Sequence, residues 1–377
     1  MSSVTLHSRK PQPPTEPDYS YISPTYQTSI AGSHQQGNYI KSYVPDTPYR
    51  DPKTNNFKAV VYLHGFSLGI PALYETHLEH LVKQGYFVFF PDYQKDSYKD
   101  EGQCQIEHEI ELISAVVESL HSSPKDWIKA AIKSTSGAFD RVTIPQTQPA
   151  QKLSDANIDV YFFGHSMGGL FALSWPYYLS QEQQKLMPLQ VVAADPVPDS
   201  LSNLPAFVRD LLDRYFKGSP FVKNPMKIED TGKSLTVPVA ILHGKQDTIV
   251  SPCSWKHPFE AIASKHKKIY FSNSDDTGNP SLSANHNQSV TDTKALLPDF
   301  LAKALGGAKS QADDLNWRYI WFALDRAIQG TAVDTLQFDM GKWSNNTPVK
   351  PIDESWPKKC ESLEATTASL RQSSVIS

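Results

Sequence analysis

The sequence predicts an α/β fold, in which a mostly parallel sheet carries helices on both faces. Short continuous apolar runs, typical of strands buried on both faces, recur along the chain and alternate with segments of helical periodicity. One of these runs, 160–163, leads directly into the motif Gly-His-Ser-Met-Gly centred on Ser166, and a helical pattern follows. A strand, a sharp turn and a helix are therefore expected around this serine.

The first elements along the chain are read from their apolar periodicity. Residues 1–36 are rich in polar residues and proline and are expected to be extended or mobile, lying against the domain as extended chain or as a first strand. Residues 37–44 alternate as an edge strand does. The later strands are expected at 58–65, 86–92, 160–163, 189–194, 237–242 and 268–271, and the helices at 73–83, 104–121, 127–133, 168–179, 255–264, 289–305 and 315–328.

No break in composition divides this pattern, so one domain is expected over residues 37–330. Two segments interrupt the alternation as insertions, one at 122–157 and one at 197–233. We expect the second insertion to lie over the sheet edge near the serine. Residues 331–377 are expected to form a polar tail that is loose after Trp343.

Composition excludes several classes of protein. The chain has 377 residues, of which 39% are hydrophobic, and a formal net charge of −4, which provides no basic footprint for nucleic acid. No apolar run is as long as a membrane span, and the N-terminal residues contain no hydrophobic signal core, so a soluble, cytoplasmic protein is expected. Cys104, Cys253 and Cys360 lie far apart, which argues against a disulfide framework and against a zinc site.

Four candidate site residues follow directly after predicted strands: Gly65, Ser166, Asp195 and Asp247. Because ligands of such sheets bind beyond the carboxyl ends of the strands, these residues are expected at one edge. A serine hydroxyl is a poor nucleophile at neutral pH. It needs a base to accept its proton and a carboxylate to orient that base.

Two aspartates compete for the role of the acid. Asp247 lies in a loop that an apolar residue and a proline would hold in place, so that its carboxylate can lean over the sheet edge. Asp195 lies one strand earlier, directly before Pro196, where a turn or cap role is the other interpretation. We favour Asp247 and keep Asp195 as the alternative acid.

His286 is the expected base, because it is the only histidine between the last predicted strand and the helix 289–305. His77 and His80 lack the spacing of a zinc-binding helix and are expected on a solvated helix face. No metal or organic cofactor is expected. The remaining histidines near the candidate edge, His64, His165 and His243, are expected to pack or to hydrogen-bond locally.

An oxyanion formed by attack of the serine needs two hydrogen-bond donors. The backbone N–H of Met167, directly after Ser166, is one candidate, and that of Phe66 is the other. Backbone donors cannot be removed by substitution. Gly65 is therefore the position where a bulky residue is expected to be most damaging.

Taken together, these residues resemble the α/β-hydrolase superfamily over 58–305. Within it, the segments 64–67, 164–169 and 237–252 are similar to cutinase-like polyester hydrolases. The chain departs from that family in having no secretion signal and in carrying long insertions. The resemblance implies a triad of Ser166, Asp247 and His286 with Phe66 and Met167 as oxyanion donors.

A second resemblance favours the other acid. Residues 194–197, together with the Gly-Phe pair of the first loop, are similar to chlorophyllases and platelet-activating-factor acetylhydrolases. In those enzymes the acid follows the earlier strand, which would give the role to Asp195.

The function expected from these features is hydrolysis of carboxylic esters through an acyl-enzyme intermediate, with a small-molecule ester as substrate. Aromatic residues and prolines in 199–233 suggest that the substrate carries an apolar group. A thioesterase, amidase or acyltransferase would use the same triad. A non-catalytic binding protein on the same fold is the alternative from another class.

Overall fold

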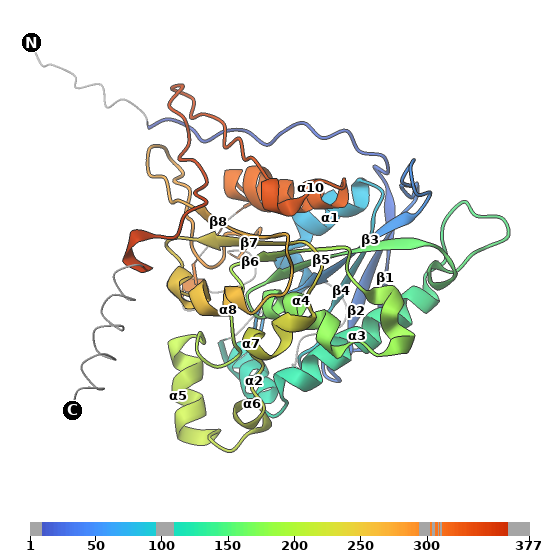
Figure 1. The fold of residues 1–377 in the computed structure, drawn as a ribbon, viewed down its shortest axis with the longest axis horizontal. Helices are drawn as coiled ribbons and strands as arrows, with labels where there is room; N and C mark the ends of the chain where they lie inside the picture. Colours follow the sequence, from blue (N-terminus) through green and yellow to red (C-terminus); the bar gives the residue numbers. More distant parts are fainter. Residues whose placement is uncertain are drawn as a thin grey trace, which may run out of the picture.

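Eight strands form one mixed sheet in the order β1-β2-β4-β3-β5-β6-β7-β8 (Figure 1). The computed structural model describes residues 10–95, 109–293, 302–303, 306–307, 309 and 311–360. Strand β2 is antiparallel to both of its neighbours, and β3 to β8 are parallel. The strands are β1 (Tyr26–Ala31), β2 (Ile40–Pro45), β3 (Phe57–Leu63), β4 (Phe87–Pro91), β5 (Ile158–His165), β6 (Gln190–Ala194), β7 (Val239–Gly244) and β8 (Lys267–Ser272).

Helices cover both faces of this sheet. Helices α1 (Glu75–Lys83) and α10 (Phe322–Ile328) pack on one face. The other face is covered by α2 (Glu109–Ser119), α3 (Pro124–Arg141), α4 (Met167–Tyr178) and α8 (Lys256–Glu260). Three further helices, α5 (Ala206–Tyr215), α6 (Pro220–Lys223) and α7 (Ile228–Thr231), belong to the segment between β6 and β7.

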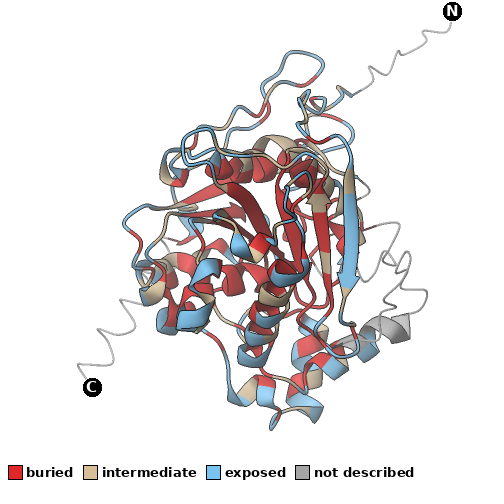
Figure 2. Ribbon diagram, turned by 90° about the vertical axis from the view of Figure 1, so that its right-hand side faces the viewer, coloured by how far each residue is buried: buried red, intermediate tan, exposed pale blue. Residues whose placement is uncertain are grey.

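The continuous apolar runs are explained by this layering. Side chains alternate along each strand, so Val61 and Phe162 enter the core on one face while Tyr62 and Phe163 enter the core on the other. All four are fully buried, and Figure 2 shows the central strands buried along most of their length. The predicted doubly covered, mostly parallel sheet is confirmed. With its strand order and the serine turn after β5, this is the α/β-hydrolase fold.

The first insertion consists mainly of one long helix, where only a short helix at 127–133 was expected. Helix α3 has 18 residues and begins with a capping box, in which the Ser123 side chain accepts from the Asp126 backbone and the Asp126 side chain accepts from Ser123. Pro124 occupies the first turn, where its missing N–H costs nothing. The helix buries Trp127, Ile128, Ala131, Ile132, Ala138 and Phe139 against the sheet.

The predicted edge strand lies one position inside the sheet. Strand β2 pairs with β1 on one side and with β4 on the other, so β1 is the edge. The strand β1 comes from the segment 1–36, which was expected to be extended or mobile. A first strand was one of the two forms expected for this N-terminal segment. The side chains of β1 are mostly exposed, so apolar periodicity did not locate it.

The C-terminal segment is packed as far as residue 360, and the expectation of a loose tail after Trp343 is wrong over this range. The indole of Trp343 is buried and donates to Asp275 Oδ2 at 3.1 Å. Further on, Asp353 and Phe271 of β8 exchange two backbone hydrogen bonds of 2.8 Å. The segment therefore covers the outer edge of β8. Its polar composition hid these contacts.

A disulfide joins Cys253 to Cys360 across 107 residues of sequence. This corrects the expectation that the cysteines remain unpaired, which rested on their wide spacing. Spacing says little when a segment as distant as that around Cys360 lies beside the segment after β7. Disulfides persist in oxidising compartments, so the pair is at odds with the expected cytoplasmic location. Cys104 lies outside the described residues.

Three expected helices differ from the observed ones. The range 255–264 is a 3-10 turn, Pro252–Trp255, followed by the short helix α8. The range 315–328 begins as a π-helix, Asn316–Trp321, and continues as α10. The range 289–305 lies largely outside the described residues; of those described, 302–303 are helical and 289–293 are not.

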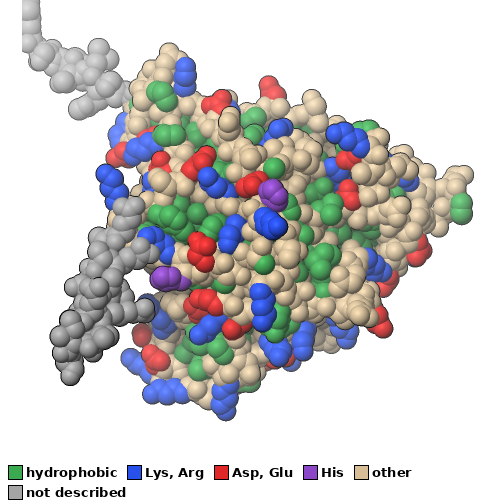
Figure 3. Space-filling view, viewed as in Figure 1, with side chains coloured by type: hydrophobic (Ala, Val, Ile, Leu, Met, Phe, Trp, Pro, Cys, Tyr) green, Lys and Arg blue, Asp and Glu red, His purple; other side chains and the backbone are tan. Residues whose placement is uncertain are grey.

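Within the described residues, no helix is both long enough and apolar enough to cross a membrane. The face of the molecule in Figure 3 carries Lys, Arg, Asp and Glu side chains in a mixed pattern. On this face the charges do not separate into a basic and an acidic region. This face is in that respect as expected from the small net charge.

Candidate active site

Ser166 lies at the turn between β5 and α4 and has an unusual backbone conformation. Its φ is 54° and its ψ is −118°. Its N–H donates to the carbonyl of Ala194 at the end of β6, with 3.0 Å between the atoms. A Cβ on Gly164 would collide with the backbone of Gly168, and a Cβ on Gly168 would collide with the carbonyls that end β3. The two glycines therefore allow the turn to form.

Ser166, His286 and Asp247 form a hydrogen-bonded row. The Nε2 of His286 lies 2.8 Å from Ser166 Oγ, and its Nδ1 lies 2.7 Å from Asp247 Oδ2. All three residues are at most 6% exposed. A carboxylate can only accept, so Nδ1 carries the proton and Nε2 is left to accept from the serine hydroxyl. The predicted serine, acid and histidine are thus brought together from three separate loops.

The loop after β7 fixes the Asp247 carboxylate. Its second oxygen, Oδ1, accepts from the backbone N–H groups of Ile249 at 2.8 Å and Val250 at 2.9 Å. Burial acts to raise the pKa of Asp247, but the charge and the hydrogen bond of His286 outweigh it and lower the pKa. The carboxylate is therefore ionised where it faces the imidazole.

Asp195, the alternative acid, holds the backbone around the site together. Its Oδ1 accepts from the N–H of Gly244 at 2.7 Å, and the side-chain amide of Gln288 lies 3.0 and 2.8 Å from its two oxygens. Burial, followed by the charge of Asp247, raises the pKa of Asp195. Asp195 thus connects the loop of the acid to the loop of His286. The imidazole hydrogen-bonds to Asp247.

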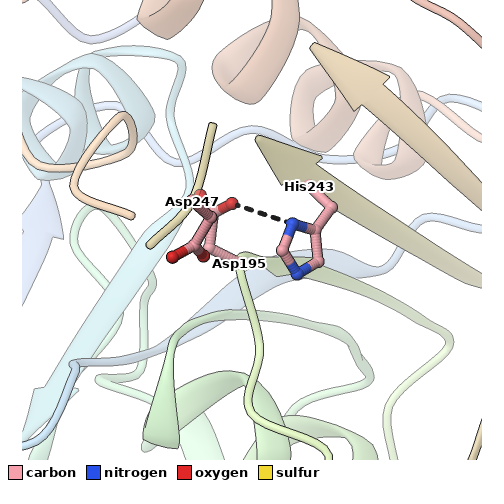
Figure 4. Close-up of side chains that lie close together, drawn as sticks. All are labelled: Asp195, His243 and Asp247. Atoms are coloured by element: carbon pink, nitrogen blue, oxygen red, sulfur yellow. Dashed lines mark ion pairs between the residues drawn. The ribbon is translucent and has the colours of Figure 1, made fainter. Parts of the chain in front are cut away.

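Asp195, His243 and Asp247 lie close enough together to raise the question of a metal (Figure 4). One potential ligand atom of each lies within 4.8 Å of the others. Both oxygens of each aspartate already accept from N–H groups of the protein. The Nδ1 of His243 lies 3.1 Å from the carbonyl of Gly244 and 3.6 Å from Asp195. The four carboxylate oxygens and Nδ1 of His243 are thus engaged within the protein, and this arrangement does not favour a cation.

The loop after β3 contains a backbone N–H group without an acceptor among the described residues. The N–H of Gly65 donates to the Tyr74 hydroxyl at 3.1 Å, and the N–H of Ser67 donates to Gln94 Oε1 at 2.7 Å. Among the described residues, the N–H of Phe66 between them has no acceptor. The N–H of Met167 is in the first turn of α4, where no carbonyl of the helix can accept it. Both candidate donors are therefore available.

Gly65 is less constrained than expected. A Cβ there would lie 3.1 Å from both His165 Nδ1 and Leu68 Cδ1, which are side-chain atoms. At Gly168 the same atom would collide with the backbone carbonyls of Leu63 and His64. Added bulk is therefore more damaging at Gly168 than at Gly65, because backbone cannot move aside as a side chain can.

A pocket opens beside Ser166 and His286. Its walls are largely apolar, with a few polar side chains on the second insertion. That insertion, after β6, therefore forms one wall. The residues that line the pocket are Phe66, Leu68, Ser166, Met167, Val197, Asp199, Ser200, Asn203, Leu204, Pro205, Ile249 and His286.

Two histidines of α1 are buried, although a solvated face was expected. His77 and His80 are 0% and 2% exposed. Both rings stack on Trp321, with centroids 5.0 Å apart in each pair, and Tyr21 of the N-terminal segment lies against His80. Those partners come from distant parts of the chain, and the local sequence does not reveal them.

The residues that support the site were not among those predicted from the sequence. Tyr74, Gln94 and Gln288 each bond to a loop that carries a candidate site residue. Gln288 lies two positions after His286, and this closeness is the one signal in the sequence that could have suggested a role for it.

No protein-family model matches the chain, and no curated protein matches it. Among solved structures, it is similar to a protein from Thermus thermophilus at 14% identity, over 66% of this chain and 89% of that chain, with a TM-score of 0.36. It is similar to a monoacylglycerol lipase from Paleococcus ferrophilus at 18% identity, over 62% and 88%, with a TM-score of 0.38. An esterase from Pyrococcus furiosus is 14% identical, over 71% and 91%, with a TM-score of 0.42. Structural similarity with TM-scores this low supports no statement about the fold or the function of this chain. The assignment of the α/β-hydrolase fold therefore rests on the strand order and the serine turn.

Proposed function

We propose that the protein is a serine hydrolase that cleaves carboxylic esters through an acyl-enzyme intermediate. The observation that carries this proposal is the unbroken row Ser166–His286–Asp247, with bonds of 2.8 and 2.7 Å. A row of this kind gives a hydroxyl both the base that accepts its proton and the carboxylate that orients the base. The ester bond is proposed because the pocket beside the serine is mostly apolar.

The proposed reaction begins when Ser166 Oγ attacks the ester carbonyl and its proton passes to His286 Nε2. The charge on Asp247 stabilises the imidazolium. The N–H groups of Phe66 and Met167 hold the oxyanion, and α4 adds the positive end of its dipole. The intermediate collapses as His286 protonates the leaving alcohol. Water then attacks the acyl-enzyme, with His286 again accepting a proton, and the acid is released.

The pocket supports a substrate with an apolar group next to the scissile bond. Leu204 and Pro205 of the second insertion line the pocket together with Phe66 and Leu68 of the loop after β3. Burial of such a group against these side chains contributes about 25 cal/mol per Å² of apolar surface. A chain-length series of esters therefore tests the size of the pocket.

The experiment that tests the proposal is hydrolysis of p-nitrophenyl esters, from acetate to long acyl chains, by the wild type and three variants. Ser166→Ala is expected to abolish turnover, and Asp247→Asn to reduce kcat by about 10⁴-fold, because the imidazole loses its orienting charge. Asp195→Asn is expected to cost much less, since the asparagine keeps an acceptor for Gly244. Far-ultraviolet circular dichroism checks that each variant is folded.

Other outcomes assign the site differently. Loss of activity in Asp195→Asn with retention in Asp247→Asn would make Asp195 the acid. Thioester and anilide substrates of matched acyl length separate a thioesterase or amidase from an esterase, and an added alcohol acceptor reveals acyl transfer. A wild-type protein that hydrolyses none of these substrates would contradict the proposed function.

A further inference from the structure

A continuous chain of hydrogen bonds runs behind the candidate site and connects two of its loops. The N–H of Gly65 lies 3.1 Å from the Tyr74 hydroxyl, which lies 2.9 Å from Nδ1 of His165. The Nε2 of His165 lies 2.8 Å from the backbone carbonyl of His286. The chain begins on the loop that carries Phe66 and ends on the residue proposed as the base.

The direction of each bond follows from its ends. A backbone carbonyl can only accept, so His165 Nε2 carries a proton and donates to His286. A neutral imidazole then has Nδ1 free to accept, and the Tyr74 hydroxyl donates to it. The oxygen of Tyr74 is left to accept the N–H of Gly65. Every donor and acceptor along this path is matched once.

The residues of this hydrogen-bond chain are buried, and its imidazole stays neutral. His165, Tyr74 and Gly65 are shielded from solvent, with His165 and Tyr74 at 0% exposure. Burial, and after it the nearby His286, lowers the pKa of His165 to about 3. The imidazole therefore stays neutral and keeps the tautomer that these bonds need. Neutrality also avoids repulsion when His286 is protonated, since the two ring centroids lie 5.2 Å apart.

We propose that Tyr74 and His165 are positioning residues that couple the oxyanion donor Phe66 to the base His286. This inference rests on the proposed function, because it assigns a role to groups that support those two residues. Tyr74 fixes the peptide next to Phe66, and His165 fixes the backbone of His286. Through their mutual hydrogen bond the two loops keep one relative position while charge builds on both the oxyanion and the imidazole.

The expected effect is on the chemical step. Displacing a reacting group by about 1 Å costs about 10²-fold in rate. Neither side chain lines the pocket beside Ser166, so substrate binding does not depend on contact with them. Tyr74→Phe, which keeps the ring and removes the hydroxyl, is expected to lower kcat about 10- to 100-fold with KM within about 3-fold.

Two substitutions of His165 each preserve one of its two hydrogen bonds, either the one to His286 or the one to Tyr74. The amide of Gln can reach the place of Nε2 and donate to His286, whereas the amide oxygen of Asn can take the place of Nδ1 and accept from Tyr74. His165→Gln is therefore expected to retain more activity than His165→Leu, and to be insensitive to a second Tyr74→Phe substitution. His165→Asn is expected to remain sensitive to it.

The matched control is Tyr270→Phe. The Tyr270 hydroxyl is likewise buried, donates to the Val333 carbonyl at 3.0 Å and accepts from the N–H of Leu336 at 3.0 Å, but it lies away from the site. Its loss is expected to lower stability while leaving kcat within about 2-fold. Equal kcat for the wild type and a folded Tyr74→Phe would overturn the positioning role.

Failure of this inference can be told apart from failure of the proposed function. A fluorophosphonate probe first reports whether Ser166 of the wild type is reactive. No labelling of the wild type overturns the proposed function, and this inference with it. Labelling of the wild type at the same rate as Tyr74→Phe and His165→Leu overturns this inference alone.

Discussion

Three residues around the candidate site have a positive φ that is rare for residues other than glycine: 55° at Ser67, 54° at Ser166 and 45° at Asp195. Such conformations cost about 1–3 kcal/mol each and persist only where the surroundings hold them. The N–H of Ser67 bonds to Gln94, that of Ser166 to the end of β6, and that of Asp195 to the Leu242 carbonyl. In each loop the backbone N–H of the strained residue thus donates to a neighbouring segment and holds the conformation.

Gly168 provides the sharpest residue-scale prediction. A methyl group there meets backbone carbonyls of the loop after β3, so Gly168→Ala is expected to destabilise the protein by about 2–3 kcal/mol and to reduce ester hydrolysis strongly. Gly137→Ala, inside α3, meets only the end of the Arg141 side chain and is expected to stabilise by about 0.5–1 kcal/mol. Urea denaturation measures both. Equal effects of the two substitutions would contradict the close packing at the serine turn.

How much of the site could be predicted differs from residue to residue. Ser166 was predictable because its glycines and the strand before it are local features. His286 was predictable by elimination along the chain. The character of its loop favoured Asp247 over Asp195, and backbone N–H groups of that same loop do hold its carboxylate. The sequence could not show what occupies Asp195, because its partners lie on other segments of the chain. Those partners, Gly244 and Gln288, meet Asp195 only after folding.

Among the helices, the first insertion shows how the sequence can indicate that a helix is present while its length is underpredicted. Ser123, Pro124 and Asp126 form a start signal for α3 that local sequence carries in full. Polar residues further along the helix obscured its length. The C-terminal segment is the opposite case, since its burial comes from contacts with β8 and leaves no local pattern.

The start signal of α3 makes a measurable prediction. Ser123→Ala removes the acceptor for the Asp126 N–H and is expected to cost about 1 kcal/mol. Lys133→Ala, at an exposed position in the same helix, is expected to change stability by no more than about 0.5 kcal/mol. Unfolding free energies in urea give both values. If Ser123→Ala lowered the unfolding free energy no more than Lys133→Ala does, the capping box would add no stability.

At the scale of the whole molecule, the disulfide Cys253–Cys360 ties the end of the described chain to the segment after Asp247. Cys253→Ser is expected to lower the unfolding free energy by about 2–5 kcal/mol, because the open chain gains conformational freedom when it unfolds. Guanidinium denaturation with and without reductant measures this. Cys104→Ser is the control. Alkylation of all three cysteines in the unreduced, unfolded protein would contradict the pairing.

Buried histidines are expected to make stability depend on pH. Burial lowers the pKa of His77 well below 6.5, so below that pH the unfolded chain binds a proton that the folded chain does not. The stabilisation is therefore present above pH 6.5 and is lost as the pH falls, by about 1.4 kcal/mol per pH unit. His77→Asn is expected to reduce this slope between pH 6.5 and 5. His257→Asn, at an exposed position, controls for the loss of one histidine, and an unchanged slope in His77→Asn would contradict the buried neutral state.

The most direct test of the central claim is covalent labelling by a fluorophosphonate, followed by intact-mass measurement and peptide mapping. The account predicts one adduct per chain, located on Ser166, absent in Ser166→Ala and formed far more slowly in a folded His286→Gln variant. An adduct elsewhere, or no adduct on a folded wild-type protein, would contradict the proposal that Ser166 is an activated nucleophile.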